Sequence, residues 1–146
     1  MPAPLGFRIH QLCLALRAAY DQELRPLHLT VAQLGALAAI EREPGASVAR
    51  LAQEKLVAPQ SMAQHVAALE RDGLVARTAA VGRGHVLELR LTPEGAAALR
   101  RGLGLLGAVE ARLWSGLDPR ERARFGELLE RHLTASVGQP GEPARE

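Results

Sequence analysis

The chain has 146 residues, 47% of them apolar and only 3% aromatic, with 18 basic and 16 acidic side chains. The length is typical of one domain, or of one domain with an added dimerisation element, and the apolar share excludes a wholly disordered chain. Because aromatic residues are scarce, the core must consist of Leu, Ala and Val, a composition that favours helices over a sheet-rich fold. The formal net charge of +2 does not by itself indicate a nucleic-acid partner.

Several kinds of protein and site find no support in the sequence. No stretch approaches the ~20 consecutive apolar residues of a membrane-spanning helix, and residues 1–8 lack the charged and apolar regions of a signal peptide. The single cysteine, Cys13, excludes an intrachain disulfide framework and a Cys-x-x-Cys site. The five histidines are scattered, so we expect no metal and no cofactor. Since no enzyme motif is present either, we expect a cytoplasmic protein that is not an enzyme and has no membrane partner.

Helical periodicity in the first third of the chain predicts two helices. Apolar residues recur at helical spacing over residues 7–25, and Pro26 predicts the end of this first helix. Thr30 and Gln33 fit a capping box that begins a second helix. Residues 43–45, Glu-Pro-Gly, predict its end.

Two further helices are predicted in close succession. Ser47 is a suitable N-cap for a short helix that ends near Lys55. Pro59 is suited to the first position of the next helix, which runs to Asp72 and is followed by Gly73, a residue typical of the position just after a helix. A short and a longer helix joined by a brief turn form a helix-turn-helix.

A β-hairpin is predicted directly after these helices. Residues 74–78 and 86–91 have strand composition, and residues 79–85 contain Gly82 and Gly84, which are typical of a turn. The second strand alternates strictly in polarity. Leu87, Leu89 and Leu91 are expected on one face, and Glu88 and Arg90 on the other.

The last part of the chain is predicted to be helical. Thr92-Pro93 begins a helix that extends to about residue 114, and Asp118-Pro119 begins another that extends to about residue 136. We expect residues 138–146, which are rich in Gly and Pro, to be a disordered tail.

The order of helix, short helix, helix and hairpin is that of a winged helix-turn-helix. The predicted fold is therefore mainly α with a small β-hairpin wing. The long helices outside this unit have no core of their own to join, but two copies can bury them against each other, so we expect a homodimer. The predicted domains are an N-terminal dimerisation helix (1–28), the winged helix-turn-helix (29–92), C-terminal dimerisation helices (93–137) and the tail (138–146).

The helix predicted over residues 59–72 is suited to contact DNA bases. Helical spacing places Met62, Val66 and Leu69 on its buried stripe, and small, uncharged residues opposite. Gln can hydrogen-bond two positions of adenine, and small residues leave room for the thymine methyl group. A solvated helix face that happens to hold two Gln is the alternative interpretation. The residues that we expect to contact bases are Gln60, Ser61, Gln64 and His65.

Basic residues around this helix are candidates for contacts with the DNA backbone. Arg83 lies between Gly82 and Gly84, which would let the tip of the hairpin approach a phosphate or enter a minor groove. Each of these residues could equally be an ordinary surface charge. The candidate backbone or wing residues are Arg50, Lys55, Arg77, Arg83 and His85.

Three sequence motifs carry a family resemblance. Residues 29–33 (Leu-Thr-Val-Ala-Gln), 69–77 (Leu-Glu-Arg-Asp-Gly-Leu-Val-Ala-Arg) and 91–95 (Leu-Thr-Pro-Glu-Gly) resemble motifs of the MarR (multiple antibiotic resistance regulator) family, over roughly residues 8–136. The resemblance implies a homodimeric winged-helix transcriptional regulator whose first and last two helices form the dimer interface. It also implies that residues 59–72 bind the major groove of a pseudo-palindromic double-stranded DNA operator and that the hairpin contacts the minor groove.

The resemblance further implies a small-molecule effector that binds between the dimerisation helices and the winged helix. The spacing of the candidate residues indicates no particular ligand. The candidates are His10, Arg17, Tyr20, His28 and Trp114. The main functional prediction is therefore a sequence-specific DNA-binding repressor that a small molecule releases from DNA.

Two other functions remain open at the level of sequence. The family's wing usually carries Asp-x-Arg or Asp-Arg-Arg, whereas this chain has Arg83, Gly84 and His85, so the first alternative is a winged-helix dimer that acts through protein contacts with weak or no DNA binding. The second alternative is a thiol-based redox-sensing repressor that uses Cys13.

The segment around Cys13 is similar to the reactive-cysteine segment of the hydroperoxide-sensing branch of the family. However, Cys13 lies about two helical turns nearer to the Leu-Thr motif than in that branch, and the tyrosines that hold the thiolate there have no counterparts. Arg17, one turn further on, could stabilise a thiolate. We expect instead a structural cysteine, buried in the apolar stripe of the first helix and slow to oxidise.

Overall fold

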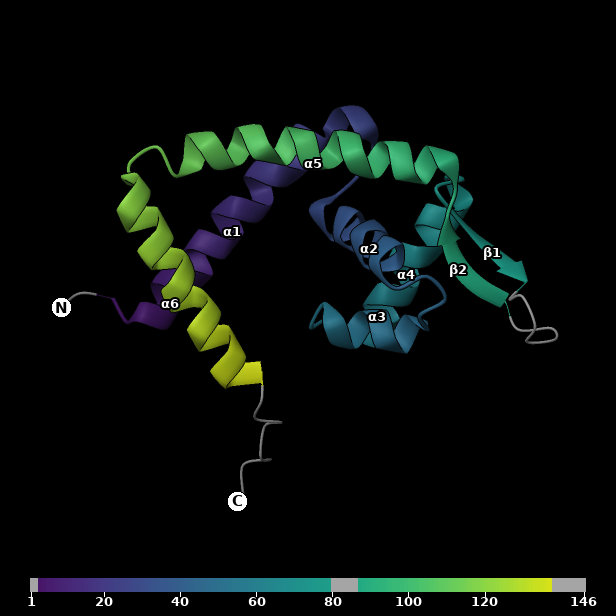
Figure 1. Ribbon diagram of the computed structural model, residues 1–146, viewed down its shortest axis with the longest axis horizontal. Helices are drawn as coiled ribbons and strands as arrows, with labels where there is room; N and C mark the ends of the chain where they lie inside the picture. Colours follow the sequence, from purple (N-terminus) through teal and green to yellow (C-terminus); the bar gives the residue numbers. More distant parts are fainter. Residues whose placement is uncertain (1–2, 80–86, 138–146) are drawn as a thin grey trace, which may run out of the picture. The chain divides into compact units, whose positions relative to one another are not determined.

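The computed structural model describes residues 3–79 and 87–137 and is mainly helical, with one two-stranded antiparallel sheet (Figure 1). The predicted fold class is confirmed, and the predicted bounds agree with the observed ones within two residues. The elements are α1 (Leu5–Leu24), the 3₁₀ helix η1 (Arg25–Leu27), α2 (Val31–Arg42), α3 (Val48–Glu54), α4 (Pro59–Arg71), β1 (Val75–Ala79), β2 (Leu87–Leu91), α5 (Pro93–Leu113) and α6 (Pro119–Val137).

The chain divides into two compact units, residues 1–109 and 110–146, and each is described by itself. The predicted turn at the hairpin tip, from residue 80 onward, and the predicted tail over residues 138–146 lie outside the described residues. In the first unit, α2, α3 and α4 gather next to the hairpin, and α1 leads away from them toward the N-terminus (Figure 1).

Local sequence signals account for where the helices of the first unit begin. The side-chain oxygen of Thr30 accepts a hydrogen bond from the Gln33 N–H at 3.2 Å, and Gln33 Oε1 accepts one from the Thr30 N–H at 2.9 Å. This is the predicted capping box of α2. Ser47 Oγ accepts a hydrogen bond from the Arg50 N–H at 3.1 Å and so caps α3. Pro59 is the first residue of α4, as predicted.

The core of the first unit lies between α2, α3, α4 and the hairpin, and also includes Leu24 of α1 and Leu99 of α5. Met62, Val66 and Leu69 are all buried, which confirms the inward stripe predicted for α4. Burial of three such side chains stabilises the fold by roughly 1.5–3 kcal/mol each. The core is formed by Leu24, Leu29, Leu34, Ala36, Leu37, Ala39, Ile40, Leu51, Ala52, Met62, Val66, Leu69, Val75, Leu89 and Leu99.

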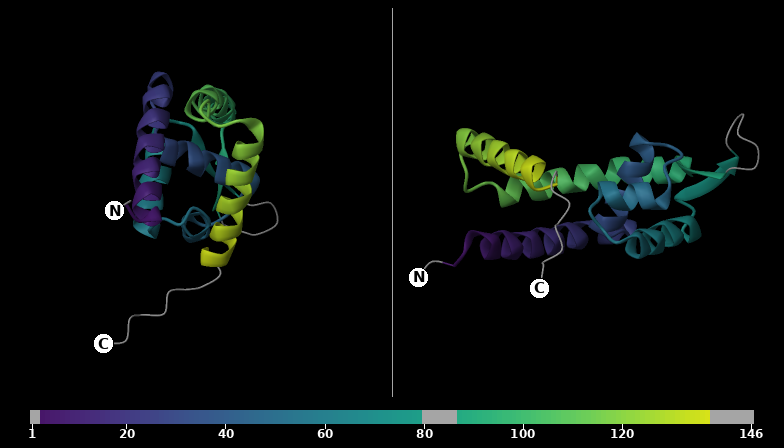
Figure 2. Two further views of the ribbon diagram at one scale, coloured as in Figure 1. Left: turned by 90° about the vertical axis from the view of Figure 1, so that its left-hand side faces the viewer. Right: turned by 90° about the horizontal axis from the view of Figure 1, so that it is seen from below.

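The hairpin joins this core at only one of its ends. Val75 pairs with Leu91 near the core, and Ala79 pairs with Leu87 at the far end. Of the three leucines predicted to share one face of β2, Leu89 is buried and Leu91 half-buried, but Leu87 is 57% exposed. Leu87 is exposed because this end of the hairpin projects beyond the helices (Figure 2), where its face has nothing to pack against.

Thr92 connects the end of α4, the start of β1 and the start of α5. Its hydroxyl donates a hydrogen bond to the Gly73 carbonyl oxygen at 2.7 Å and accepts one from the Gly95 N–H at 3.0 Å. Its own N–H donates to the Leu74 carbonyl oxygen at 3.1 Å. The first turn of α5 approaches the backbone so closely that a Cβ atom at Gly95 would lie 1.9 Å from the Leu74 oxygen. These contacts explain why Thr and Gly stand where they do in the motif at residues 91–95.

Candidate nucleic-acid interface

Helix α4 exposes a small and uncharged face. Gln60 and Gln64 are exposed, as are Ala63 and Ala67, and the next exposed residue on this face is Arg71. The face is exposed because the opposite stripe of α4 fills the core. A face of this kind can approach base edges without steric or electrostatic conflict.

The remaining two predicted base contacts lie at the borders of this face. Ser61 and His65 are both half-buried. All four candidates therefore lie on one helix, with the two Gln side chains one turn apart and exposed. The structure brings together the side chains that the base-contact hypothesis requires.

The turn between α3 and α4 presents apolar residues that sequence reasoning missed. Leu56 adopts a left-handed backbone conformation (φ 53°) and is 67% exposed, and the neighbouring Val57 is 38% exposed. The Val57 N–H donates a hydrogen bond to the Ala52 carbonyl oxygen at 3.0 Å, which fixes this tight turn. The only sequence signal for this apolar turn was the presence of two adjacent apolar residues just before the predicted DNA-contacting helix.

The candidate backbone contacts that the structure describes are all engaged in ion pairs. Arg77 Nε lies 2.8 Å from Oε1 of Glu70, which is a residue of α4. Arg50 Nε lies 3.2 Å from Glu43 Oε2. Of the remaining three candidates, Arg83 and His85 lie outside the described residues.

Lys55, the third described candidate, lies in a small charged cluster. Its Nζ is 3.4 Å from Glu54 Oε1, which also forms an ion pair with Arg42. Burial lowers the pKa of the Lys55 ammonium group, and the nearby Arg42 guanidinium lowers it further. A DNA phosphate would therefore have to compete with Glu54 for this lysine.

A shallow pocket of about 300 Å³ lies between α1 and the start of α2. Arg17 and Tyr20, two of the predicted effector-binding residues, line it. The carboxylate of Asp21 connects the two helices at this point, because its Oδ1 accepts a hydrogen bond from the Val31 N–H at 2.6 Å and its Oδ2 lies 3.8 Å from Arg17 Nε. The full lining is Cys13, Leu16, Arg17, Tyr20, Val31 and Ala32.

The structure does not place three other residues of this region where the sequence predicted them. His10 and His28 are exposed and do not line the pocket. The expectation that Cys13 is buried is wrong for the single chain, in which this residue is exposed. The periodicity identified the apolar stripe of α1, but most of α1 extends away from α2, α3 and α4 of the same unit (Figure 1).

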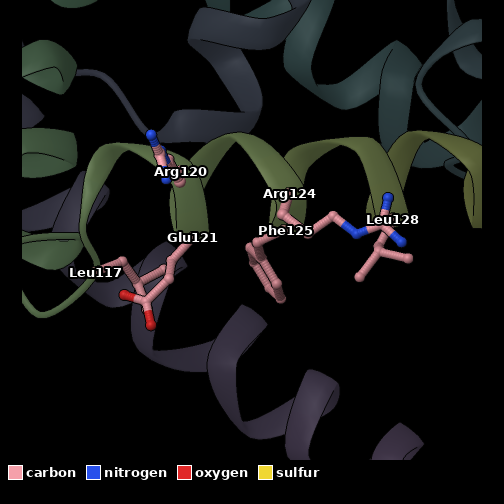
Figure 3. A pocket seen from close by; sticks show the side chains of 6 residues that line it. All are labelled: Leu117, Arg120, Glu121, Arg124, Phe125 and Leu128. Carbon is pink, nitrogen blue, oxygen red and sulfur yellow. The ribbon is translucent and has the colours of Figure 1, made fainter.

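Trp114, the remaining candidate effector-binding residue, belongs to the C-terminal unit. Its indole N–H donates a hydrogen bond to Glu110 Oε2 at 2.6 Å, and its ring centroid lies 5.6 Å from that of Phe125. Phe125 in turn lines an open pocket of about 480 Å³ along α6, where it projects from the same side of the helix as Glu121 and Leu128 (Figure 3). The complete lining is Leu117, Arg120, Glu121, Arg124, Phe125 and Leu128.

Within residues 3–79 and 87–137, no group of three His, Cys, Asp or Glu side chains is placed to hold a metal ion. Over the same residues, no helix has both the length and the apolar character needed to span a membrane.

Comparison with known proteins decides the family. The model of the MarR family matches residues 28–84, which include α2, α3, α4 and β1. The HTH-type transcriptional repressor Rv2887 of Mycobacterium tuberculosis is 34% identical over 129 residues, which are 88% of this chain and 93% of that protein. The chain belongs to the MarR family.

Solved structures agree with this assignment to the MarR family. The structure of Rv2887 from Mycobacterium tuberculosis in complex with salicylic acid has a TM-score of 0.76 and 34% identity, and covers 89% of this chain and 96% of that one. The structure of Rv2887 in complex with DNA has a TM-score of 0.73 and 30% identity, and covers 89% and 98%. The resemblance predicted from the three motifs is confirmed, and this MarR-family chain has the winged helix-turn-helix fold.

Proposed function

We propose that this chain is a homodimeric, sequence-specific DNA-binding repressor that a small aromatic carboxylate releases from its operator. The observation that carries the proposal is the exposed, uncharged face of α4 within a winged helix-turn-helix, in a chain whose relative Rv2887 has been crystallised with DNA. Gln60, Ser61, Gln64 and His65 contact bases in this proposal, and Arg50, Lys55, Arg77, Arg83 and His85 contact the backbone. The protein acts in the cytoplasm and has no catalytic activity.

Exposed apolar side chains on the long helices support the homodimer. In α1, Phe7 is 58% exposed and Leu14 is 56% exposed, and in α6 Leu133 is 51% exposed. Apolar surface of this extent is typical of an interface. In the proposed domain organisation, residues 1–28 and 93–137 form the dimer interface and residues 29–92 bind DNA, so that two α4 helices lie one DNA turn, about 34 Å, apart.

The pocket between α1 and α2 is the proposed effector site. Arg17 supplies a cation for a carboxylate, and Leu16 and Val31 supply apolar walls for an aromatic ring. One relative, Rv2887, has been crystallised with two molecules of this class, salicylic acid and p-aminosalicylic acid. A ligand carboxylate would compete with Asp21 for Arg17 and thereby disturb the connection between Asp21 and the start of α2.

The first test selects a binding site from a pool of random 30-base-pair duplexes and then measures affinity by electrophoretic shift. We expect one pseudo-palindromic sequence to be enriched, the protein to sediment as a dimer at micromolar concentration, and salicylate to release the selected duplex. In Arg17→Ala, release should need at least about tenfold more salicylate, whereas Arg8→Ala, a substitution on the same helix but outside the pocket, should respond as wild type. Failure to enrich any sequence, or a monomer, would contradict the proposed function.

Release by oxidation is not part of the proposal. A reactive thiolate needs a nearby cation, and Arg17, one turn from Cys13, pairs with Asp21. We therefore expect Cys13→Ser to leave both the affinity for the selected duplex and its response to cumene hydroperoxide unchanged in a shift assay. Release of DNA from wild type but not from Cys13→Ser would instead assign the protein to the redox-sensing branch.

A further inference from the structure

The DNA-binding unit carries almost no excess of positive charge. Residues 41–91 hold seven basic and six acidic side chains. Each basic side chain of this segment that the structure describes lies within ion-pair distance of a carboxylate. The pairs are Arg42–Glu54, Arg50–Glu43, Lys55–Glu54, Arg71–Asp72, Arg77–Glu70 and Arg90–Glu88.

Three of these pairs involve the cations proposed to contact the DNA backbone. Glu43, Glu54 and Glu70 are the partners of Arg50, Lys55 and Arg77. Two of the pairs join different elements of the fold: Glu70 lies on α4 and Arg77 on β1, and Glu43 follows α2 whereas Arg50 lies on α3. Glu43 and Glu70 are therefore held beside their cations by the tertiary structure, whereas Glu54 and Lys55 are neighbours at the end of α3.

A cation that already has a carboxylate partner gains little binding free energy from a contact with a DNA phosphate. Non-specific DNA binding depends almost entirely on phosphate contacts and on the release of counterions from DNA. If a phosphate replaces the carboxylate, the displaced carboxylate remains close to the negatively charged backbone and repels it. Contacts to bases do not depend on this exchange, so the carboxylates remove most of the binding free energy of a non-operator sequence but only part of that of the preferred sequence.

We propose that Glu43, Glu54 and Glu70 suppress binding to non-operator DNA. This inference rests on the proposed function, because it takes α4 and its neighbours as the DNA-binding surface. Glu70 has the largest role of the three, since it is part of α4 itself and its Oε1 lies 2.8 Å from Arg77 Nε. Arg77 is held in one orientation by this contact and becomes a free phosphate-binding cation when the charge of Glu70 is removed.

The test compares charge-removing and charge-retaining substitutions. Glu70→Gln should lower the dissociation constant for a shuffled duplex of the same base composition about fivefold, the effect of removing one repulsive charge close to a phosphate. The slope of log K against log salt on this duplex should become steeper by about 0.9, equivalent to one more phosphate contact. Affinity for the selected duplex should rise by no more than the same factor, because its base contacts are unchanged.

The controls separate local charge from net charge and from altered folding. Glu70→Asp keeps the charge and should behave as wild type, and Glu127→Gln removes one charge from an ion pair of the C-terminal unit, with Arg124, outside the winged helix. Glu43→Gln provides a second test at an exposed pair, in case Glu70→Gln folds poorly. Equal affinity of Glu70→Gln, Glu43→Gln and Glu127→Gln for the shuffled duplex, measured with folded proteins, would overturn the inference. Failure of wild type to enrich any sequence would instead count against the proposed function.

Discussion

Gly95→Ala is expected to lower the free energy of unfolding by about 3 kcal/mol. The added methyl group would lie 1.9 Å from the Leu74 carbonyl oxygen, a backbone atom that cannot rotate away. The Leu74 oxygen is also held in place, because it accepts a hydrogen bond from the Thr92 N–H. Relief of the clash therefore requires α5 to move away from β1, which loosens the packing of α5 on the core. Urea denaturation followed by circular dichroism measures the loss.

Gly104→Ala is the matched control for this experiment, because both glycines lie in α5. In the described part of the structure, no atom lies within 4 Å of a Cβ at Gly104. Alanine is favoured over glycine in helices by about 1 kcal/mol, so this variant should be as stable as wild type or slightly more stable. Equal stability of the two variants would show that the start of α5 is not in close contact with the backbone at Leu74.

Gln64→Ala is expected to weaken binding to the selected duplex by about 1–3 kcal/mol and to relax sequence preference at one base pair. Gln64 is exposed in the centre of the uncharged face of α4, where its amide can donate to and accept from one base edge. The salt dependence should not change, since the side chain neutralises no phosphate. Titration of the selected duplex and of its single-base variants by electrophoretic shift measures both effects.

Gln22→Ala is the control for the loss of one exposed amide, because Gln22 lies on α1, outside the winged helix. It should bind the selected duplex as wild type does. If Gln64→Ala also bound the selected and the shuffled duplexes with wild-type affinities, Gln64 would not contact a base, and the orientation proposed for α4 on DNA would be wrong.

Local signals account for the parts of the fold that could be predicted from sequence. The ends of the helices are set by residues within one turn of them, which act through local hydrogen bonds or through their own backbone conformation. These residues are Thr30 with Gln33, Ser47, Pro59 and Gly73. The same holds for the uncharged face of α4, because helical periodicity alone separates it from the buried stripe. The predicted helix ends and the predicted exposed face of α4 were therefore correct.

Features that depend on contacts between elements could not be predicted from the sequence. The pairing of Arg77 with Glu70 requires the position of β1 against α4, and nothing in the spacing of these residues indicates a contact. Cys13 lies on an apolar stripe, but the stripe does not reveal whether the same chain covers it. The left-handed conformation of Leu56 is unusual for a residue with a branched side chain, so the shape of the turn before α4 could not be predicted either.

The hydrogen bonds of Thr92 have a mechanical consequence. Because this one residue joins Gly73 at the end of α4, Leu74 at the start of β1 and Gly95 in the first turn of α5, these elements form a rigid body with few internal degrees of freedom. A change in the spacing of two α4 helices on DNA would therefore carry the start of β1 and the first turn of α5 with it.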